Sequence, residues 1–220
     1  MTDLVFLEPN KLGSEPFTTS DVIAAQAQIS YRSVQRMIER HENDLAEFGQ
    51  VRFQITPVKY ARGTNDKKIY QLNEQQATLL ITYLKNTPPV RQFKKDLVQE
   101  FYRMRRELTR RQIFRDAGKP IRRTLTDAIR DSGEDGRMHG HAYGTYTDLA
   151  YKAATGKIAR VLRKERGASA KAIATDFLTS DELSAYNKAE ERLTVLLDMG
   201  LTYDQIKTLL LVQTGKRMAG

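Results

Sequence analysis

Residues 20–40 read SDVIAAQAQISYRSVQRMIER, and this stretch predicts two short helices joined by a tight turn. The hydroxyl and carboxylate side chains at 18–21 can accept hydrogen bonds from the free N–H groups of a first helical turn, so the first helix is expected over Val22–Gln28. Ser30 can cap a second helix over about Tyr31–Glu42. The buried face of this second helix is expected to contain the apolar residues at helical spacing, Val34, Met37 and Ile38.

The apolar and small residues of this pair have the spacing of a helix-turn-helix, in which two helices cross closely. The matching positions are Ile23, Ala24, Ala27, Ile29, Val34 and Met37. Gln28 departs from the pattern, because glycine is usual in a turn that favours positive φ. A plainer alternative is a pair of amphipathic helices with a solvated polar face.

The outward face of the second helix carries side chains that can contact DNA. Arginine can bridge O6 and N7 of guanine and glutamine can pair with adenine, whereas serine and tyrosine commonly bind phosphates. On this helix the candidate DNA-binding residues are Ser30, Tyr31, Arg32, Ser33, Gln35, Arg36 and Arg40.

The sequence period changes after residue 50 to the alternation that is typical of a β-hairpin. Val51–Ile55 and Lys67–Leu72 predict two strands, and Arg62–Asp66 has the composition of a turn. Pro57 restricts the first strand to an edge or a bulge. A hairpin after a helix-turn-helix gives a winged arrangement, and the wing adds four candidate DNA contacts, Lys59, Arg62, Lys67 and Lys68.

Helical patterns dominate the rest of the chain. Asn73 and Gln76 form a capping-box pattern that opens a helix through Leu84, and a basic helix is expected from Val90 to about Ile113. This basic helix predicts phosphate contacts or, through its apolar stripe, pairing of two subunits. Shorter helices are expected over 124–130, 145–154, 157–166, 180–199 and 203–212.

The predicted fold is therefore mostly α with a small β-hairpin. A lead-in over 1–16 precedes an N-terminal winged helix-turn-helix domain over 17–113. A linker with a short helix over 114–140 leads to a small helical C-terminal bundle over 141–220.

Composition favours an acidic partner and excludes several classes of site. The 220 residues include 36 Lys and Arg against 27 Asp and Glu, which gives a net charge of +9 and favours nucleic acid. Cysteine is absent, which excludes disulfides, thiol catalysis and cysteine-ligated zinc. No secretory pattern opens the chain, and its longest apolar runs are far shorter than the roughly 20 residues of a membrane span. We expect a cytoplasmic protein without a membrane partner.

No catalytic residue, metal ligand or cofactor is predicted. His139 and His141 with Asp148 raise the alternative of a nuclease, but two histidines without an ordered set of carboxylates do not complete a ligand shell. The glycines over 133–144 match neither a phosphate loop nor a dinucleotide fingerprint. We therefore expect a protein that is not an enzyme.

Four motifs, taken in order, resemble the phage regulatory protein Rha family over about residues 17–108. They are Phe17-Thr18-Thr19-Ser20, the helix with Val34, Met37 and Ile38, the Tyr70-Gln71-Leu72-Asn73 step, and Lys94-Lys95…Val98…Phe101-Tyr102-Arg103-Met104. One stretch departs from the family, because Asn86-Thr87-Pro88-Pro89 occupies the place where such proteins usually carry a Thr-Gly step. The resemblance implies a phage- or prophage-encoded regulator that acts through DNA in the cytoplasm of the bacterial host cell.

Residues and resemblance together predict a transcriptional regulator that binds double-stranded DNA through its winged helix-turn-helix. A homodimer is expected, since helix-turn-helix proteins commonly bind as symmetric dimers. The alternative is an antirepressor-like protein that binds another phage or host regulatory protein and does not read DNA. A second basic cluster over 157–171 predicts either a bundle surface or a further DNA contact.

Overall fold

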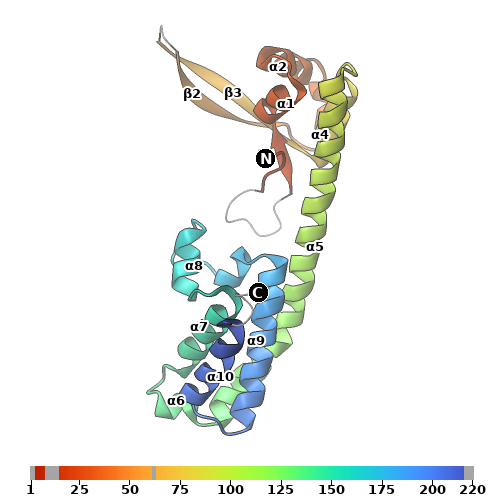
Figure 1. Ribbon diagram of the computed structural model, residues 1–220. Coiled ribbons are helices and arrows are strands. Elements are labelled where there is room, and N and C mark those ends of the chain that lie inside the picture. Colours follow the sequence, from red (N-terminus) through yellow and green to blue (C-terminus); the bar gives the residue numbers. More distant parts are fainter. Residues whose placement is uncertain (1–2, 8–14, 61–62, 216–220) are drawn as a thin grey trace. The chain divides into compact units, whose positions relative to one another are not determined.

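The computed structural model describes residues 3–7, 15–60 and 63–215. The chain forms two compact units, Met1–Arg106 and Glu107–Gly220, which we call unit 1 and unit 2. Each unit has its own buried apolar core. The structure is mostly helical with a small antiparallel sheet near the N-terminus, as the sequence predicted (Figure 1).

Unit 1 begins with a short strand and three helices. Strand β1 (Phe17–Thr19) leads into α1 (Ser20–Ala27), α2 (Tyr31–Arg40) and α3 (Glu42–Ala46). The hydroxyl of Thr19 accepts a hydrogen bond from the N–H of Val22 and caps α1. The sequence missed β1 and α3, because elements of three and five residues are too short to show a period.

A three-stranded sheet follows, in the order β1-β3-β2. Strands β2 (Arg52–Tyr60) and β3 (Gly63–Asn73) form a long antiparallel hairpin in the register Phe53↔Tyr70 and Pro57↔Asp66 (Figure 1). β2 is an edge strand, which confirms the restriction that Pro57 imposed.

The turn between β3 and the next helix is fixed by a buried glutamine. Helix α4 (Glu74–Thr82) begins with the predicted capping box, in which Asn73 and Gln76 each accept a backbone hydrogen bond from the other. The amide of Gln76 also donates to the carbonyl oxygens of Leu45 and Gly49, at 3.2 and 2.7 Å. These bonds join α4 to the segment before β2, so a residue at the start of one helix positions the base of the hairpin.

Helix α5 (Pro88–Asp131) is longer than the sequence predicted. The expected end near Ile113 and the separate helix over 124–130 are wrong, because one helix continues through Gly118 and Pro120. The buried residues Leu125 and Ile129 pack into the core of unit 2, and this packing outweighs the helix-breaking tendency of glycine and proline. The predicted linker over 114–140 thus contains the end of α5 and the short α6 (Glu134–Arg137).

The remainder of unit 2 is a helical bundle. Helices α7 (Ala142–Thr155) and α8 (Ala159–Glu165) are separated by Gly156, which adopts the left-handed conformation at φ 76° and ends α7. A 3₁₀ turn (Ala174–Phe177) precedes α9 (Ser180–Asp198) and α10 (Tyr203–Gly215), and α9 packs against both α7 and α10.

Two features show how closely unit 2 is packed. Glu190, whose side chain is 1% exposed, accepts hydrogen bonds from Arg122 at 2.9 Å and from the hydroxyl of Tyr186 at 2.8 Å. Burial raises the pKa of Glu190 above its ordinary value and raises that of Tyr151, beside Tyr186, to about 12. A Cβ atom at Gly118 would lie 2.7 Å from Oδ1 of the buried Asn187, so α5 and α9 approach closely there.

Candidate nucleic-acid interface

Helix α2 is held by its cap and by its buried face. The hydroxyl of Ser30 accepts a hydrogen bond from the N–H of Ser33 at 3.1 Å, which confirms the predicted N-cap. Val34 and Ile38 are fully buried in the core of unit 1. Because these residues lie on one side of the helix, the opposite side is left to solvent.

The turn before α2 contains a residue with positive φ, the conformation that favours glycine. Gln28, which ends α1, adopts the left-handed region at φ 54° and ψ 43°. The N–H of Ile29 donates to the carbonyl oxygen of Ala24 at 3.0 Å and closes the turn. The unusual residue therefore does not prevent the usual geometry, and α1, α2 and the β2–β3 hairpin are together compatible with the predicted winged helix-turn-helix.

The solvent side of α2 carries a stripe of arginines, Arg32, Arg36 and Arg40. All three side chains are exposed, and none has a hydrogen-bond or ion-pair partner within the described part of the chain. Residues four apart on a helix are neighbours about 6 Å apart along its axis, so the stripe extends over about 12 Å. We call these three residues the α2 arginine stripe.

Other predicted contacts on α2 have partners within unit 1. The amide of Gln35 donates to Glu39 at 3.0 Å, and the hydroxyls of Ser30 and Ser33 lie 2.7 Å apart. The hydroxyl of Tyr31 donates to the backbone carbonyl of Lys68 on β3. Partial burial raises the pKa of Tyr31, so its hydroxyl stays protonated and remains a donor. Tyr31 therefore attaches α2 to the hairpin.

The hairpin lysines have partners as well. Nζ of Lys67 lies 2.6 Å from a carboxylate oxygen of Asp21 on α1, and 4.4 Å from the centre of the Tyr31 ring. Nζ of Lys68 lies over the rings of Phe53 and Tyr70, at 4.1 and 4.7 Å. These contacts fix where the two positive charges are held relative to α2. The side chain of Lys59 and the whole of Arg62 lie outside the described residues.

Three residues that position the hairpin were not predicted from the sequence. The N–H of Tyr70 donates to the hydroxyl of Ser20 at 3.0 Å, and the hydroxyl of Tyr70 donates to Glu39 at 3.2 Å. Burial raises the pKa of Tyr70, and a hydrogen bond with Tyr70 raises that of Lys68. These partners are 31 and 50 residues apart, so no local pattern could have indicated them.

This geometry lies within the part of the chain that matches a known family. Residues 18–106 match the family of the phage regulatory protein Rha. The match confirms the resemblance predicted over 17–108, and no curated protein matches the chain. It suggests a phage regulatory role, and the family is not a known enzyme family, which is compatible with the expectation of a non-enzyme.

Within the Rha-matching region, α5 adds exposed cations and also cations that are paired. Nη2 of Arg105 contacts Glu74 on α4 at 2.6 Å, and Nζ of Lys94 contacts Asn86 at 2.8 Å. The exposed basic residues of this segment whose side chains form no hydrogen bond or ion pair with the described residues are Arg91, Lys95 and Arg106. The composition of α5 did not show which of its predicted phosphate-contacting residues also have partners within the fold.

The structure does not assemble the alternative nuclease site. His139 and His141 are exposed, whereas the carboxylate of Asp148 accepts a hydrogen bond from the N–H of Ala159 at 3.2 Å. Among the described residues, no group of three or more His, Asp or Glu side chains is placed to hold a metal ion. None of the described helices is both long and apolar enough to cross a membrane.

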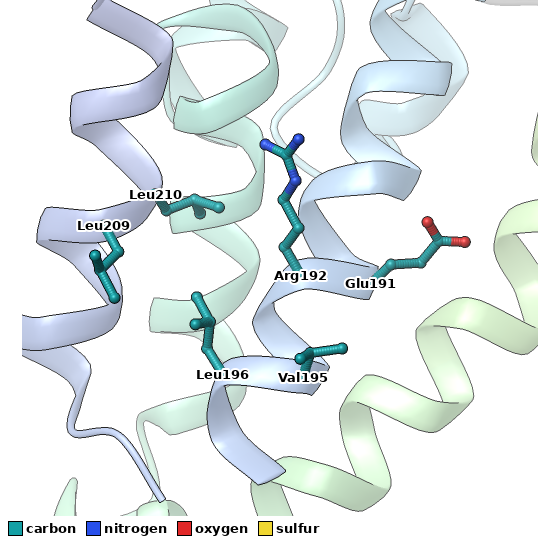
Figure 2. Close-up of a pocket in the computed structure, with 6 residues that line it drawn as sticks. All are labelled: Glu191, Arg192, Val195, Leu196, Leu209 and Leu210. Atoms are coloured by element: carbon teal, nitrogen blue, oxygen red, sulfur yellow. The ribbon is translucent and has the colours of Figure 1, made fainter. Parts of the chain in front are cut away.

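A hollow of about 500 Å³ between α9 and α10 was not predicted. Figure 2 shows Leu209 and Leu210 across the hollow from Leu196, whereas the carboxylate of Glu191 points away from α10. Its lining is mainly apolar and belongs entirely to unit 2, so it is separate from the α2 arginine stripe.

Proposed function

We propose that this protein is a phage regulator that binds double-stranded DNA, with α2 in the major groove and the hairpin beside it. The α2 arginine stripe carries the proposal, because it places three unpaired guanidinium groups on the solvent side of a helix. A buried apolar face and a capped N-terminus hold that helix in place. Arginine is the side chain that most often contacts guanine specifically, through O6 and N7.

The attachment of the hairpin to α1 and α2 also supports this proposal. Tyr31, Lys67 and Tyr70 connect β3 to α1 and α2 through contacts that span the sheet and both helices. The attached β2–β3 hairpin, the wing, keeps a fixed position relative to α2. Binding of α2 to one groove and of the wing to the flanking phosphates requires such a fixed arrangement. In this proposal Tyr31 and Lys67 position the wing, whereas Arg32, Arg36 and Arg40 contact DNA.

The test begins with selection of bound duplexes from a random pool by the full-length protein at fixed salt. Arg32→Ala and Arg36→Ala should then each reduce discrimination between the selected and random duplexes by about 1–3 kcal/mol. Arg91→Ala, which removes an exposed arginine of α5, serves as the matched control and should weaken both duplexes equally.

Two results would count against the proposal. If no sequence is enriched from the pool, or if Arg32→Ala and Arg36→Ala weaken selected and random duplexes equally, α2 does not read bases. A regulator that copurifies with the protein and is lost on Arg32→Ala, with no DNA preference, would support the antirepressor alternative instead.

A further inference from the structure

Unit 2 carries a second cationic surface, on α8 and the segment that follows it. Ala159 and Leu162 are buried and attach α8 to the core of unit 2. The opposite side carries the exposed Arg160 and Lys164, and Lys171 is exposed after the helix, whereas Arg163 is half-buried beside the packed face. We call the three exposed cations, Arg160, Lys164 and Lys171, the α8 surface.

Two contacts fix the position of α8 on its neighbour. Gly156 ends α7 in the left-handed conformation, and the carboxylate of Asp148 on α7 accepts a hydrogen bond from the first N–H of α8, at Ala159. Arg160 and Lys164 lie four residues apart, so helical geometry places their side chains next to each other on the exposed side. The surface is therefore built into the fold of unit 2.

The nearby acidic groups are already engaged by other cations. Glu165, the single acidic residue over 157–171, pairs with Lys157. Glu182 on α9 accepts from Arg166 at 2.8 Å. Arg160, Arg163, Lys164 and Lys171 have no hydrogen-bond or ion-pair partner within the described part of the chain, and Nε of Arg163 is buried without one.

This arrangement is unfavourable in the isolated chain. Like charges three and four residues apart on a helix repel one another, and here no described carboxylate offsets that repulsion. An anion bound along the helix would reduce it. The charge pattern therefore favours a linear polyanion as the partner.

We propose that the α8 surface binds the phosphate backbone of a nucleic acid, independently of base sequence. Residues 157–173 contain no aromatic residue, and their exposed large apolar residues are Val161 and Ile173. Protein interfaces are enriched in aromatic residues and depleted of lysine at their centres, so this surface fits a polyphosphate better than an acidic protein. A second contact on the same chain would raise the overall affinity for DNA.

The test measures binding of the full-length protein to a duplex of random sequence, between about 50 and about 200 mM salt. The triple variant Arg160→Gln, Lys164→Gln and Lys171→Gln should weaken binding at least about tenfold at the lower salt. It should also reduce the slope of log affinity against log salt by about 2–3, because each phosphate contact contributes about 0.9.

A charge-matched triple variant is the control. Arg123→Gln, Lys188→Gln and Lys207→Gln remove the same charge from exposed positions on α5, α9 and α10. This control should change affinity less than about twofold, with a slope near that of the wild type. Equal losses in both triples would show that only net charge matters and would overturn the proposal, as would wild-type binding by the α8 triple.

A gain of affinity gives a second test. Glu165→Gln releases Lys157 from its ion pair, so it should tighten binding to the random duplex and steepen the salt slope by about 1. Unchanged binding would contradict the proposal. If polyglutamate of matched charge displaces the duplex as well as unlabelled duplex does, the surface is selective for charge alone, and nucleic acid is not its particular partner.

Phosphate binding by the α8 surface is independent of base reading by α2. The α8 triple should leave the ratio between selected and random duplexes unchanged, whereas Arg32→Ala should reduce that ratio. Loss of random binding in the α8 triple, with discrimination intact in Arg32→Ala, would refute the proposed function and retain this inference. The opposite pattern would refute this inference alone.

Discussion

The two units use polar side chains differently. In unit 1, partly exposed groups such as Tyr31 and Lys67 form long-range contacts that attach a hairpin to two helices. In unit 2, the carboxylate of Glu190 is buried and depends on Arg122 and Tyr186. Each solvent-exposed polar contact contributes little to the free energy of unfolding. A buried ionised group, in contrast, destabilises the fold strongly once its partner is removed. Unit 1 thus uses polar contacts to position a surface, and unit 2 depends on them for stability.

The largest expected effect lies in unit 2. Arg122→Ala removes the cation beside Glu190 and should reduce the free energy of unfolding by about 3–5 kcal/mol, because it leaves a buried carboxylate unpaired. Arg123→Ala, at the exposed neighbouring position, should change it by less than about 0.5 kcal/mol. Denaturant titrations of the two variants measure the difference, and similar losses would remove the distinction between the units.

The loss in Arg122→Ala should depend on pH. Burial raises the pKa of Glu190 in the folded protein, so folding favours the protonated acid. Stability from such a group is present below its unfolded pKa and is lost as the pH rises through the folded one. The loss of unfolding free energy in Arg122→Ala should therefore be smallest in acid and increase toward neutral pH. A loss that does not change with pH would argue against a charge effect.

A smaller effect is expected where α5 and α9 approach each other in unit 2. Gly118→Ala places a Cβ within 2.7 Å of Oδ1 of Asn187, whose amide donates to the carbonyl of Phe114. We expect a loss of about 1–3 kcal/mol, because overpacking exceeds the gain in helix propensity of about 1 kcal/mol. Gly144→Ala on α7 meets no atom within 4 Å and should instead stabilise by about 1 kcal/mol in thermal unfolding. The same sign for both would contradict the close approach.

In unit 1 a single attachment should contribute less. Tyr31→Phe removes the hydrogen bond to the carbonyl of Lys68 and should cost about 0.5–1.5 kcal/mol of unfolding free energy. Breaking a contact speeds up amide hydrogen exchange first in the segment that loses it. Backbone hydrogen exchange along β3 is therefore the measurement to use. Tyr102→Phe, at a side chain that is 56% exposed on α5, is the control, and an equal change there would rule out a positioning role for Tyr31.

The smallest effect is expected in the turn before α2. Gln28→Gly should stabilise unit 1 by about 0.5–1 kcal/mol. The left-handed conformation costs a non-glycine residue about 1–2 kcal/mol, and the greater conformational entropy that glycine loses on folding offsets part of this gain. Gln26→Gly, inside α1, should destabilise by about 1 kcal/mol. Thermal unfolding measures both, and a loss in Gln28→Gly would mean that the glutamine side chain stabilises the turn.

Local chemistry could be predicted from the sequence, and long-range contacts could not. The caps at Ser30 and at Asn73 with Gln76 depend on residues three apart, and the structure confirms both. The continuity of α5 through Pro120 depends instead on how its later turns pack in unit 2, which no window of sequence contains. The helices of unit 2 were predicted in order because their apolar spacing is regular, although α6, with four residues, was missed.

The candidate site shows the same division. Exposure of the α2 arginine stripe follows from the helical period once Val34 and Ile38 are assigned to the core. The partners of Tyr31 and Lys67 lie on other elements, so no local pattern indicated that these two predicted DNA contacts also attach the hairpin. Composition alone therefore does not show which cations have partners within the fold.

The edge of the hairpin has a consequence for behaviour in concentrated solution. β2 has no neighbour on its outer side within the described sheet, and it exposes Phe53 and Ile55. A bare edge with apolar side chains can recruit the same strand of another molecule and start aggregation. Pro57 interrupts the row of N–H donors midway along this strand, so a foreign strand could not pair along its whole length. A single imino acid thereby helps to keep a long, projecting ribbon from self-association.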